Sequence, residues 1–426
     1  MLDIKFIREN PDTVKKDLEK RQDSEKLVWV DEILNLDADY RKMLRENQAL
    51  RQGRNAITDE INILRKKGED FKRKVLEAKE LPQKIKESDE NLEKVKAKLD
   101  YYLMRLPNIL HESVPYGKDS DDNKVVREWG EKPKFDFELK SHGELLTELG
   151  LANFEKAAEV SGQGFYYLLG DMARLELALI NFAVDYLCEK GFILVEPPLM
   201  LRRKPYEGVT DLKDFETTMY KVENEDLFMI ATSEHPIAAL VMNEIFEEQK
   251  LPIKYAGISQ CFRKELGSHS LDTKGLFRVH QFNKIEQFIF CKPEDSWKFH
   301  EELLKNAEEI YQKLKIPYRV VNICTGDIGI VAAKKYDIEA WFPRENLYRE
   351  VVSCSNCTAY QATRLNIKFK KGEDKEFVHT LNSTAIATSR TLRAIIENYQ
   401  QKDGSIKVPQ VLQKYLGKKV ISKKDG

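Results

Sequence analysis

Apolar side chains recur every three or four residues over residues 33–64, which is the spacing of one face of a helix. The positions of this repeat are Ile33, Leu36, Tyr40, Met43, Asn47, Leu50, Arg54, Ile57, Ile61 and Leu64. After Gly68 the same spacing returns at Leu92, Val95, Leu99, Tyr102 and Leu106. The alternation of three and four is a heptad repeat, with Asn47 and Arg54 as polar members. Two such helices joined by a Gly-containing turn predict an antiparallel coiled-coil arm, roughly 50 Å long for helices of about 35 residues.

A proline and a high density of charged residues change what we expect of this arm. Pro82 lies inside the second helical pattern, where a proline removes a hydrogen bond, so we expect a bend or a short break near Leu81. Lys and Arg are dense along the arm but alternate with Glu and Asp, which is typical of a solvated coiled coil. If the arm contacts an RNA backbone, the favoured cations are Arg51, Arg54, Arg65, Lys66, Lys67 and Arg73.

Beyond Pro107 the pattern changes to short strands alternating with amphipathic helices. Expected strands cover residues 165–169, 192–195, 227–231, 318–323, 338–341, 347–353 and 359–369. Expected helices cover residues 171–190, 297–314 and 382–399, with another starting at Pro236. The strands are joined by hairpins rather than regular βαβ crossovers, which predicts an α+β domain with a mainly antiparallel sheet flanked by helices. A dinucleotide-binding fold is disfavoured, because Gly162, Gly164 and Gly170 do not fit its glycine motif.

These patterns divide the chain into four parts. Residues 1–110 form the helical coiled-coil domain, and residues 111–134, with Pro115, Gly117 and an acidic patch, form a linker. Residues 135–417 form the mixed α+β domain. Residues 418–426 are a basic tail that we expect to be disordered.

A predicted β-hairpin over residues 255–290 carries the strongest chemical signal. Alternation places Arg263 and Glu265 on one face of the first arm. On the second arm one face carries Arg278, His280, Phe282, Lys284 and Glu286, and the other carries Phe277, Val279 and Ile285. An Arg can bind a phosphate or carboxylate, a Phe can stack on a purine and a carboxylate can accept from an amine. This combination suits a site that holds ATP beside an amino acid, although a solvated sheet face with surface ion pairs remains the alternative.

Composition adds limits on location and partners. The 426-residue chain has a formal net charge of −1, so any nucleic-acid surface must be local. No apolar run reaches the length of a membrane span, and the start lacks a signal-peptide core, so we expect a cytoplasmic protein with no membrane contact.

The six Cys are scattered, which favours a reduced state. Cys354 and Cys357 form a C-x-x-C without a second pair at matching spacing, so we expect no structural zinc.

Three segments resemble the signature motifs of class II aminoacyl-tRNA synthetases: a helix and strand ending at Pro198, F-R-x-E at 262–265 with its hairpin, and a late helix carrying Arg390. Within that class the chain resembles the seryl-tRNA synthetases over nearly its whole length. The matching segments, behind the helical arm, are TSE at 232–234, FRKE at 262–265, GLFRVHQFNKIEQF at 275–288, VNICTGDIG at 321–329, EVVSCSNC at 350–357 and LNSTAIATSRTLRAIIENYQ at 381–400. NSTAIATSR is closer to archaeal and eukaryotic cytosolic members, whereas Thr363 stands where Arg is frequent.

The resemblance implies a serine–tRNA ligase that uses ATP and Mg²⁺ to form seryl-adenylate, releases pyrophosphate, and transfers serine to the 3′-terminal adenosine of tRNA(Ser), with tRNA(Sec) as a second candidate acceptor. The implied catalytic residues are Arg263, Glu286 and Arg390. The implied serine-binding residues are Thr232, Glu234, Arg263, Glu286, Asn382 and Thr384. The implied ATP-binding residues are Arg263, Lys264, Glu265, Arg278, Val279, Phe282, Glu350, Val351, Val352, Ser353 and Arg390. Glu350 and Ser353 are the implied metal ligands, and strict alternation would separate them, so we expect a β-bulge or a strand end there.

Individual roles follow from the same resemblance. Arg263 would contact both the α-phosphate and the serine carboxylate, and Phe282 would stack on adenine with Arg390 on its other side. Glu265 would hold the adenine amino group. Asn382 and Thr384 could instead cap the last helix. The arm would reach across a homodimer to the long variable arm of the tRNA.

Three other functions stay open from the sequence. The first is a catalytically silent synthetase paralogue with a tRNA-binding or regulatory role. The second is a structural coiled-coil protein. The third is a class II synthetase of another specificity, such as threonyl or prolyl.

Overall fold

The computed structural model describes residues 1–211, 217–264 and 275–423. The chain divides into two compact units, Met1–Pro107 and Asn108–Gly426, each of which is described by itself. In the described ranges, no helix combines the length and apolar character needed to cross a membrane.

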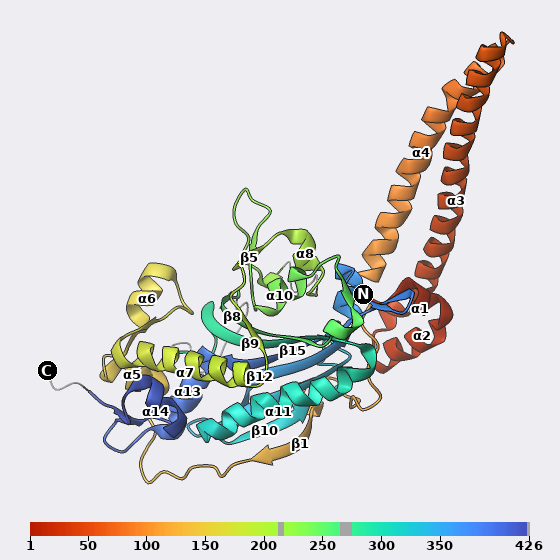
Figure 1. The fold of residues 1–426 in the computed structure, drawn as a ribbon. Helices are drawn as coiled ribbons and strands as arrows, with labels where there is room; N and C mark the ends of the chain where they lie inside the picture. The colour runs from red at the N-terminus through yellow and green to blue at the C-terminus, as the bar shows by residue number, and fades with distance from the viewer. Residues whose placement is uncertain (212–216, 265–274, 424–426) are drawn as a thin grey trace. The chain divides into compact units, whose positions relative to one another are not determined.

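The first unit is entirely helical. Two short helices, α1 (Ile4–Glu9) and α2 (Pro11–Lys20), precede two long antiparallel helices, α3 (Ser24–Lys67) and α4 (Lys72–Leu103) (Figure 1). Gly68 ends α3 with a left-handed φ of 72°, a conformation that favours glycine at a helix C-terminus. The long helices confirm the predicted arm.

The predicted heptad seam lies between α3 and α4. Ile33, Asn47 and Leu99 are buried, whereas Arg54 is exposed, so the seam is confirmed except at Arg54. The Asn47 side-chain amide donates to Ser88 Oγ at 3.0 Å and to Asp89 Oδ1 at 2.9 Å on α4. A buried polar contact of this kind fixes the register of the two helices, because any shift would leave the amide unpaired.

Pro82 does not interrupt α4, which is one continuous helix from Lys72 to Leu103. The predicted break near Leu81 is therefore wrong. A single proline removes one backbone hydrogen bond, and the packing of α4 along α3 on both sides of it is enough to keep the helix continuous.

The second unit is built on an eight-stranded sheet with the order β1-β10-β11-β12-β15-β9-β8-β4. These strands are β1 (Lys124–Trp129), β4 (Ile193–Val195), β8 (Ile253–Phe262), β9 (Gln281–Cys291), β10 (Tyr318–Asn322), β11 (Lys334–Phe342), β12 (Leu347–Thr358) and β15 (His379–Ala387). Every neighbouring pair is antiparallel except β4 and β8, which are parallel. This confirms the predicted mainly antiparallel α+β domain.

The two faces of the sheet pack on different helices, and alternation along β9 separates them. Ile285 and Ile289 join the core formed with α7 (Gly170–Glu189), α11 (Ser296–Leu314) and α13 (Thr388–Tyr399). Phe288 and Phe290 join a second core with α8 (Arg203–Glu207), α10 (Glu234–Leu240) and α12 (Tyr360–Leu365). Figure 1 shows α7 and α11 lying along the sheet, with α8 and α10 grouped apart from them.

Shorter elements complete the second unit. Further helices in the described ranges are α5 (His142–Glu148), α6 (Phe154–Ser161), α14 (Gln410–Leu416), and the 3₁₀ turns η1 (Ser120–Asp122), η2 (Glu248–Lys250) and η3 (Pro293–Asp295). The remaining strands are β2 (Ala152–Asn153), β3 (Tyr167–Leu168), β5 (Met200–Leu201), β6 (Phe228–Met229), β7 (Ile245–Glu247), β13 (Lys368–Lys371), β14 (Asp374–Phe377), β16 (Ile406–Lys407) and β17 (Val420–Ile421).

Four local predictions differ from the structure. The expected strand at 359–369 is instead α12 followed by β13. Thr358 (φ 47°) ends β12 and Asn366 (φ 54°) ends α12, because both residues have a left-handed backbone conformation. The last helix begins at Thr388 rather than 382, so Asn382 and Thr384 lie in β15 and do not cap it. The expected linker contains β1, an edge strand of the sheet. The expected disordered tail contributes β17, which pairs with β16.

Candidate functional site

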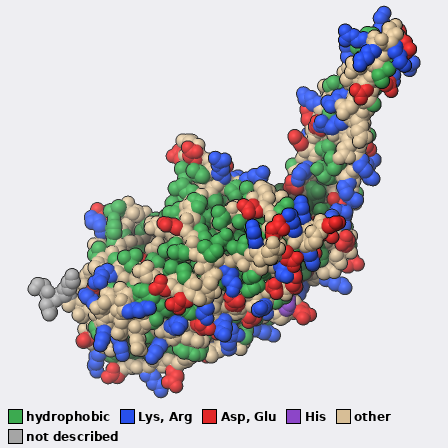
Figure 2. All heavy atoms as spheres, in the orientation of Figure 1, with side chains coloured by type: hydrophobic (Ala, Val, Ile, Leu, Met, Phe, Trp, Pro, Cys, Tyr) green, Lys and Arg blue, Asp and Glu red, His purple; other side chains and the backbone are tan. Residues whose placement is uncertain are grey.

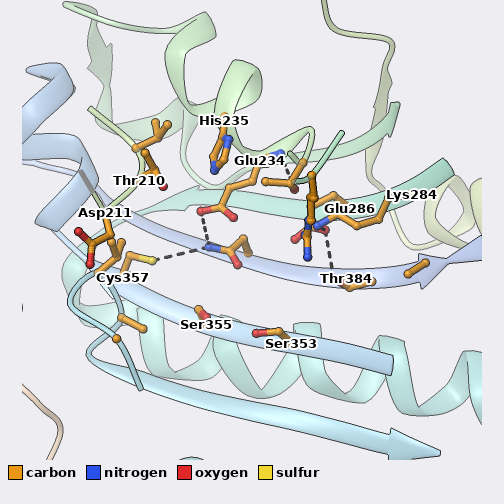
Figure 3. Close-up of a pocket in the computed structure, with 18 of the residues that line it drawn as sticks. Thr210, Asp211, Glu234, His235, Lys284, Glu286, Ser353, Ser355, Cys357 and Thr384 are labelled. Carbon is orange, nitrogen blue, oxygen red and sulfur yellow. Dashed lines mark hydrogen bonds and ion pairs between the residues drawn. The ribbon is translucent and has the colours of Figure 1, made fainter. Parts of the chain in front are cut away.

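A cavity of about 360 Å³ opens on the face of the sheet that carries α10 and α12 (Figure 3). Eleven of the residues predicted from the sequence line it: Thr232, Glu234, Arg263, Phe282, Glu286, Glu350, Val351, Ser353, Asn382, Thr384 and Arg390. They come from β9, β12, β15, α10 and α13, and from the residues that follow β8 and precede α10, all of them distant in sequence. The structure therefore gathers the predicted serine-binding set completely and the ATP-binding set in part.

Strand alternation explains how each strand delivers its side chains. Phe282, Lys284 and Glu286 follow every second position of β9, and Thr384 of β15 pairs directly with Glu286. On β12 the register shifts at Val351, since Ile338 of β11 lies opposite Val352 while Glu339 lies opposite Glu350. This β-bulge lets both Glu350 and Ser353 line the cavity, and it confirms the bulge predicted there.

Glu234 begins α10 and presents its carboxylate to the cavity. Its Oε1 accepts from Gln361 Nε2 at 2.8 Å and from Asn382 Nδ2 at 3.0 Å. Burial, together with the negative charge of Glu286, raises the pKa of Glu234 to about 7. This carboxyl group can therefore change its protonation state near neutral pH.

Glu286 and Lys284 form a buried ion pair with 2.5 Å between Nζ and Oε2. Thr384 Oγ1 also donates to Glu286 Oε2 at 3.3 Å. Burial raises the pKa of Glu286, while Lys284 opposes that shift. A buried charge of this kind is tolerated only with a partner, so the pair constrains both side chains.

Arg263 follows β8 and donates through Nε to the Ala231 carbonyl at 3.3 Å. Its guanidinium lies 5.3 Å from the centre of the Phe282 ring. Arg390 instead lies 5.1 Å from the Phe277 ring and donates through Nη1 to the Glu350 carbonyl at 3.0 Å. The cation beside Phe282 is thus Arg263, and Arg390 lies beside Glu350.

Glu350 faces positive charge. Desolvation by the cavity walls would raise its pKa, but Arg390, Lys335 and Arg263 outweigh this effect and hold the pKa below its usual range. Glu350 is therefore ionised at neutral pH. Ser353 follows the bulge that Glu350 precedes, and it lies opposite Asp337 of β11.

The oxygens of Glu350 and Ser353 fit a hard divalent cation, which prefers carboxylate and hydroxyl ligands. Within residues 1–211, 217–264 and 275–423, no group of three or more His, Cys, Asp and Glu side chains is placed to hold a metal. A cation here would take its other ligands from a bound substrate or from water.

Several predicted ATP-binding residues do not line the cavity. Lys264 Nζ lies 5.5 Å from the Tyr220 ring, and Arg278 is exposed. Val279 packs with Cys261, and Val352 lies in the opposite core. The alternation drawn from residue 278 was wrong, because β9 begins only at Gln281. Glu265 lies outside the described residues.

Other residues that line the cavity were not predicted as site residues. Lys284 could have been found, since alternation already placed it between Phe282 and Glu286. His235, whose pKa burial lowers to about 3 with help from Lys284 and Arg263, carried no signal in the sequence. Other loop positions also carried no signal, because they depend on tertiary folding: Val209, Thr210, Asp211, Ile330, Val331 and Ala332. Ile328 and Gly329 lie in the matching segment 321–329, but no role was predicted for them. Ser355 and Cys357 complete the β12 wall.

Taken together, the cavity is lined by four carboxyl groups, of Asp211, Glu234, Glu286 and Glu350, and by three cations, of Arg263, Lys284 and Arg390. Such a site can bind a zwitterion, whose ammonium meets the carboxylates and whose carboxylate meets a guanidinium. A flat ring and two arginines beside it can bind an aromatic base and phosphates.

Comparisons with known proteins agree with this geometry. Residues 1–110 match the model of the seryl-tRNA synthetase N-terminal domain, and residues 218–399 match the tRNA synthetase class II core domain (G, H, P, S and T). The serine–tRNA ligase of Methanocella arvoryzae is 61% identical over 419 residues, covering 98% of this chain and 99% of that protein. The serine–tRNA ligase of Pyrococcus horikoshii is 53% identical over 443 residues, covering 99% and 97%.

Solved structures give the same result. Seryl-tRNA synthetase from Pyrococcus horikoshii complexed with ATP superposes with a TM-score of 0.90 at 52% identity, covering 99% of this chain and 100% of the other. The cytoplasmic serine–tRNA ligase from Naegleria fowleri in complex with AMP superposes with a TM-score of 0.85 at 40% identity, covering 100% and 99%.

Proposed function

The chain belongs to the seryl-tRNA synthetases and is a serine–tRNA ligase, and on this premise we propose that serine and ATP react in the cavity described above. The observation that carries the proposal is that Arg263, Phe282 and Glu286 line one cavity. The alternative of a catalytically silent paralogue has no support in the comparisons.

The serine end of the cavity is the part around Glu234 and Glu286. Glu234 Oε1 already accepts two amide donors, which leaves Oε2 to accept from the serine ammonium. Glu286, held by Lys284 and Thr384, accepts from the serine hydroxyl. Alanine lacks that hydroxyl and would bury the Glu286 carboxylate with one donor fewer than serine provides, which disfavours alanine. Thr232 and Asn382 close this end of the cavity.

The nucleotide end lies around Phe282, Arg263 and Arg390, where adenine stacks on the Phe282 ring. Arg263 lies between the two ends and binds both the serine carboxylate and the α-phosphate, which would otherwise repel each other. A serine carboxylate oxygen attacks the α-phosphorus, forming the acyl–phosphate bond while the bond to pyrophosphate breaks. Because positioning and charge neutralisation carry such a step, the fixed arginines supply most of what it needs.

We assign Glu350 and Ser353 to Mg²⁺, on the strength of the bulge that brings both to the cavity. When bound, the ion neutralises negative charge on the ATP phosphates. Arg390, beside Glu350, adds positive charge at the same end. The seryl group then passes to a hydroxyl of the terminal ribose of tRNA, and AMP is released.

The arm, within residues 1–110, is the proposed tRNA-binding part. Figure 2 shows Lys and Arg side chains gathered at its tip. Arg65, Lys66, Lys67 and Arg73 are exposed there, near the turn between α3 and α4. Arg51 is engaged with Asp89 on α4, with 2.7 Å between Nη2 and Oδ2, which makes it less available to RNA than the tip. A basic tip suits the phosphate backbone of an RNA arm, which proteins recognise by charge and shape.

We also infer a homodimer in which β4 lies at the subunit interface. β4 is the last strand of the sheet and exposes Ile193 (58%) and Leu194 (46%), which point to opposite faces. The other edge strand, β1, also exposes Val125 and Val126, but a register shift interrupts it and charged side chains flank them. Bulges and charges protect an edge against pairing, and β4 has neither.

All six cysteines are free, which supports a cytoplasmic location.

The first prediction concerns serine activation. Glu286→Ala should lower kcat/KM for serine in ATP–pyrophosphate exchange roughly 10- to 150-fold, because the serine hydroxyl loses a charged acceptor whose hydrogen bond contributes about 1.5–3 kcal/mol. Glu302→Ala, which loses an ion pair with Lys254 away from the cavity, is the matched control and should exchange normally. A folded parent protein without serine-dependent exchange would overturn the proposed function.

The second prediction concerns the arm. Replacing Arg65, Lys66, Lys67 and Arg73 with Ala should raise the KM for tRNA at least roughly tenfold and weaken its salt dependence, since fewer counterions are released. Serine-dependent exchange should be unchanged. The control replaces four arm cations that pair with acidic neighbours: Arg41, Lys84, Lys96 and Lys98. Equal aminoacylation by both variants would show that the tip does not bind tRNA.

The third prediction concerns the dimer. Leu194→Asp should dissociate the protein into monomers in sedimentation equilibrium, because a charge would be buried at the proposed interface. Val126→Asp, at the other edge and equally exposed, should leave the mass unchanged. A monomeric parent protein, or a dimeric Leu194→Asp variant, would rule out β4 as the interface.

A further inference from the structure

Gln361 of α12 is a polar side chain that is completely buried yet does not line the cavity. Its Nε2 donates to Glu234 Oε1 at 2.8 Å and to the Val209 carbonyl at 3.1 Å. Its Oε1 accepts from Thr380 Oγ1 at 2.7 Å. A buried amide is costly unless its bonds are satisfied, and here both ends of the amide are used.

The first consequence concerns the carboxylate of Glu234. Gln361 and Asn382 donate to the same oxygen, Oε1, from α12 and β15. In the described part of the chain, Oε2 receives no hydrogen bond, and the carboxylate lines the cavity (Figure 3). Two donors on one oxygen fix the rotation of the carboxylate and leave the other oxygen for a ligand. Asn382 itself lines the cavity, whereas Gln361 donates to Glu234 from outside the cavity lining.

The second consequence concerns the wall formed by Thr210 and Asp211. Gln361 holds the carbonyl of Val209, the residue immediately before them. Arg364, three residues further along α12 and therefore on the same side of the helix, donates through Nη1 to the Thr210 carbonyl at 2.6 Å and to the Glu207 carbonyl at 3.2 Å. One short helix thus fixes the backbone of this wall and the orientation of Glu234.

We propose that Gln361 is a positioning residue that sets serine affinity and selectivity by holding the Glu234 carboxylate and the Val209–Thr210 backbone together. The proposal rests on the proposed role of Glu234 in serine binding. A pocket can exclude the extra methyl group of threonine only if its walls do not yield, because one methyl alone gives weak discrimination. The fixed wall supplies that rigidity, and the fixed carboxylate supplies the acceptor for the ammonium.

The test is Gln361→Met, which keeps the length of the side chain and removes all three hydrogen bonds. The serine KM in ATP–pyrophosphate exchange should rise roughly 10- to 100-fold, the range expected for polar partners left unsatisfied in a buried site. The KM for ATP should stay unchanged, and the ratio of threonine to serine activation should rise. The acid limb of the pH profile of kcat/KM for serine should move to higher pH, because ionised Glu234 loses a donor.

The matched control is Gln287→Met on β9. Gln287 is also completely buried, donates to the Leu303 carbonyl at 3.2 Å and accepts from Asn306 Nδ2 at 3.0 Å, on the face opposite Glu286. Its loss should lower thermal stability while leaving the serine KM and the pH profile unchanged. A merely structural role of Gln361 would make the two variants alike in all these measurements, and that result would overturn the proposal.

A second variant covers the case in which Gln361→Met does not fold. Gln361→Glu keeps the shape and the acceptor for Thr380 but places a carboxylate against Glu234, which raises the pKa of Glu234. Its serine KM at neutral pH should therefore rise, and the acid limb of its pH profile of kcat/KM for serine should move to higher pH than in the parent. An unchanged serine KM and pH profile in Gln361→Glu would overturn the role of Gln361 alone. The proposed function fails separately, through loss of serine-dependent exchange in the parent protein.

Discussion

The structure depends on a balance of buried charge on one face of the sheet. At the serine end of the cavity, Lys284 and Arg263 are the cations and Glu234 and Glu286 the carboxyl groups, while Arg390, Glu350 and Asp211 line other parts of it. A buried charge without a partner would destabilise the fold by several kcal/mol, so Lys284 and Glu286, which are buried and paired, hold each other in place. In the proposed function, serine binds there as a zwitterion, which adds no net charge to the cavity. The carboxyl groups and cations of the cavity can therefore pair with the ammonium and the carboxylate of serine.

The sheet reaches this arrangement by departing from regular pairing at three points. The register shifts at Val351 and Cys357 on β12 and at Ala385 on β15. Each bulge adds one residue to a strand and re-aims the side chains that follow it. The shift at Val351 brings Glu350 and Ser353 to the same cavity, and the shift at Ala385 comes directly after the pairing of Thr384 with Glu286. Among the described residues, three of the sheet's four register shifts therefore lie on strands that line the cavity, and the fourth lies on edge strand β1.

Sequence periodicity predicted the parts of the molecule that depend on local patterns. The heptad spacing gave α3 and α4, and alternation placed Phe282 and Glu286 on one face of β9. Alternation failed at Arg278, because strand β9 begins only at Gln281 and periodicity does not show where a strand starts. The sequence predicts a strand where α12 forms, because a short apolar pattern fits both a strand and a helix. The left-handed residues Thr358 and Asn366 lie on either side of α12, and periodicity does not show them. Gln361 gave no signal at all, because its role exists only after α12 packs behind Glu234.

The most direct test of the charge balance is a double-mutant cycle between Lys284 and Glu286, measured as the free energy of unfolding in urea by tryptophan fluorescence. Lys284→Met alone should destabilise the fold by about 3–5 kcal/mol, because it leaves Glu286 as a buried charge without its cation. Adding Glu286→Gln should restore at least about 2 kcal/mol of that loss, because the remaining side chain is neutral and keeps its shape. Additive effects of the two substitutions would contradict the account, since they would show that the two charges do not depend on each other.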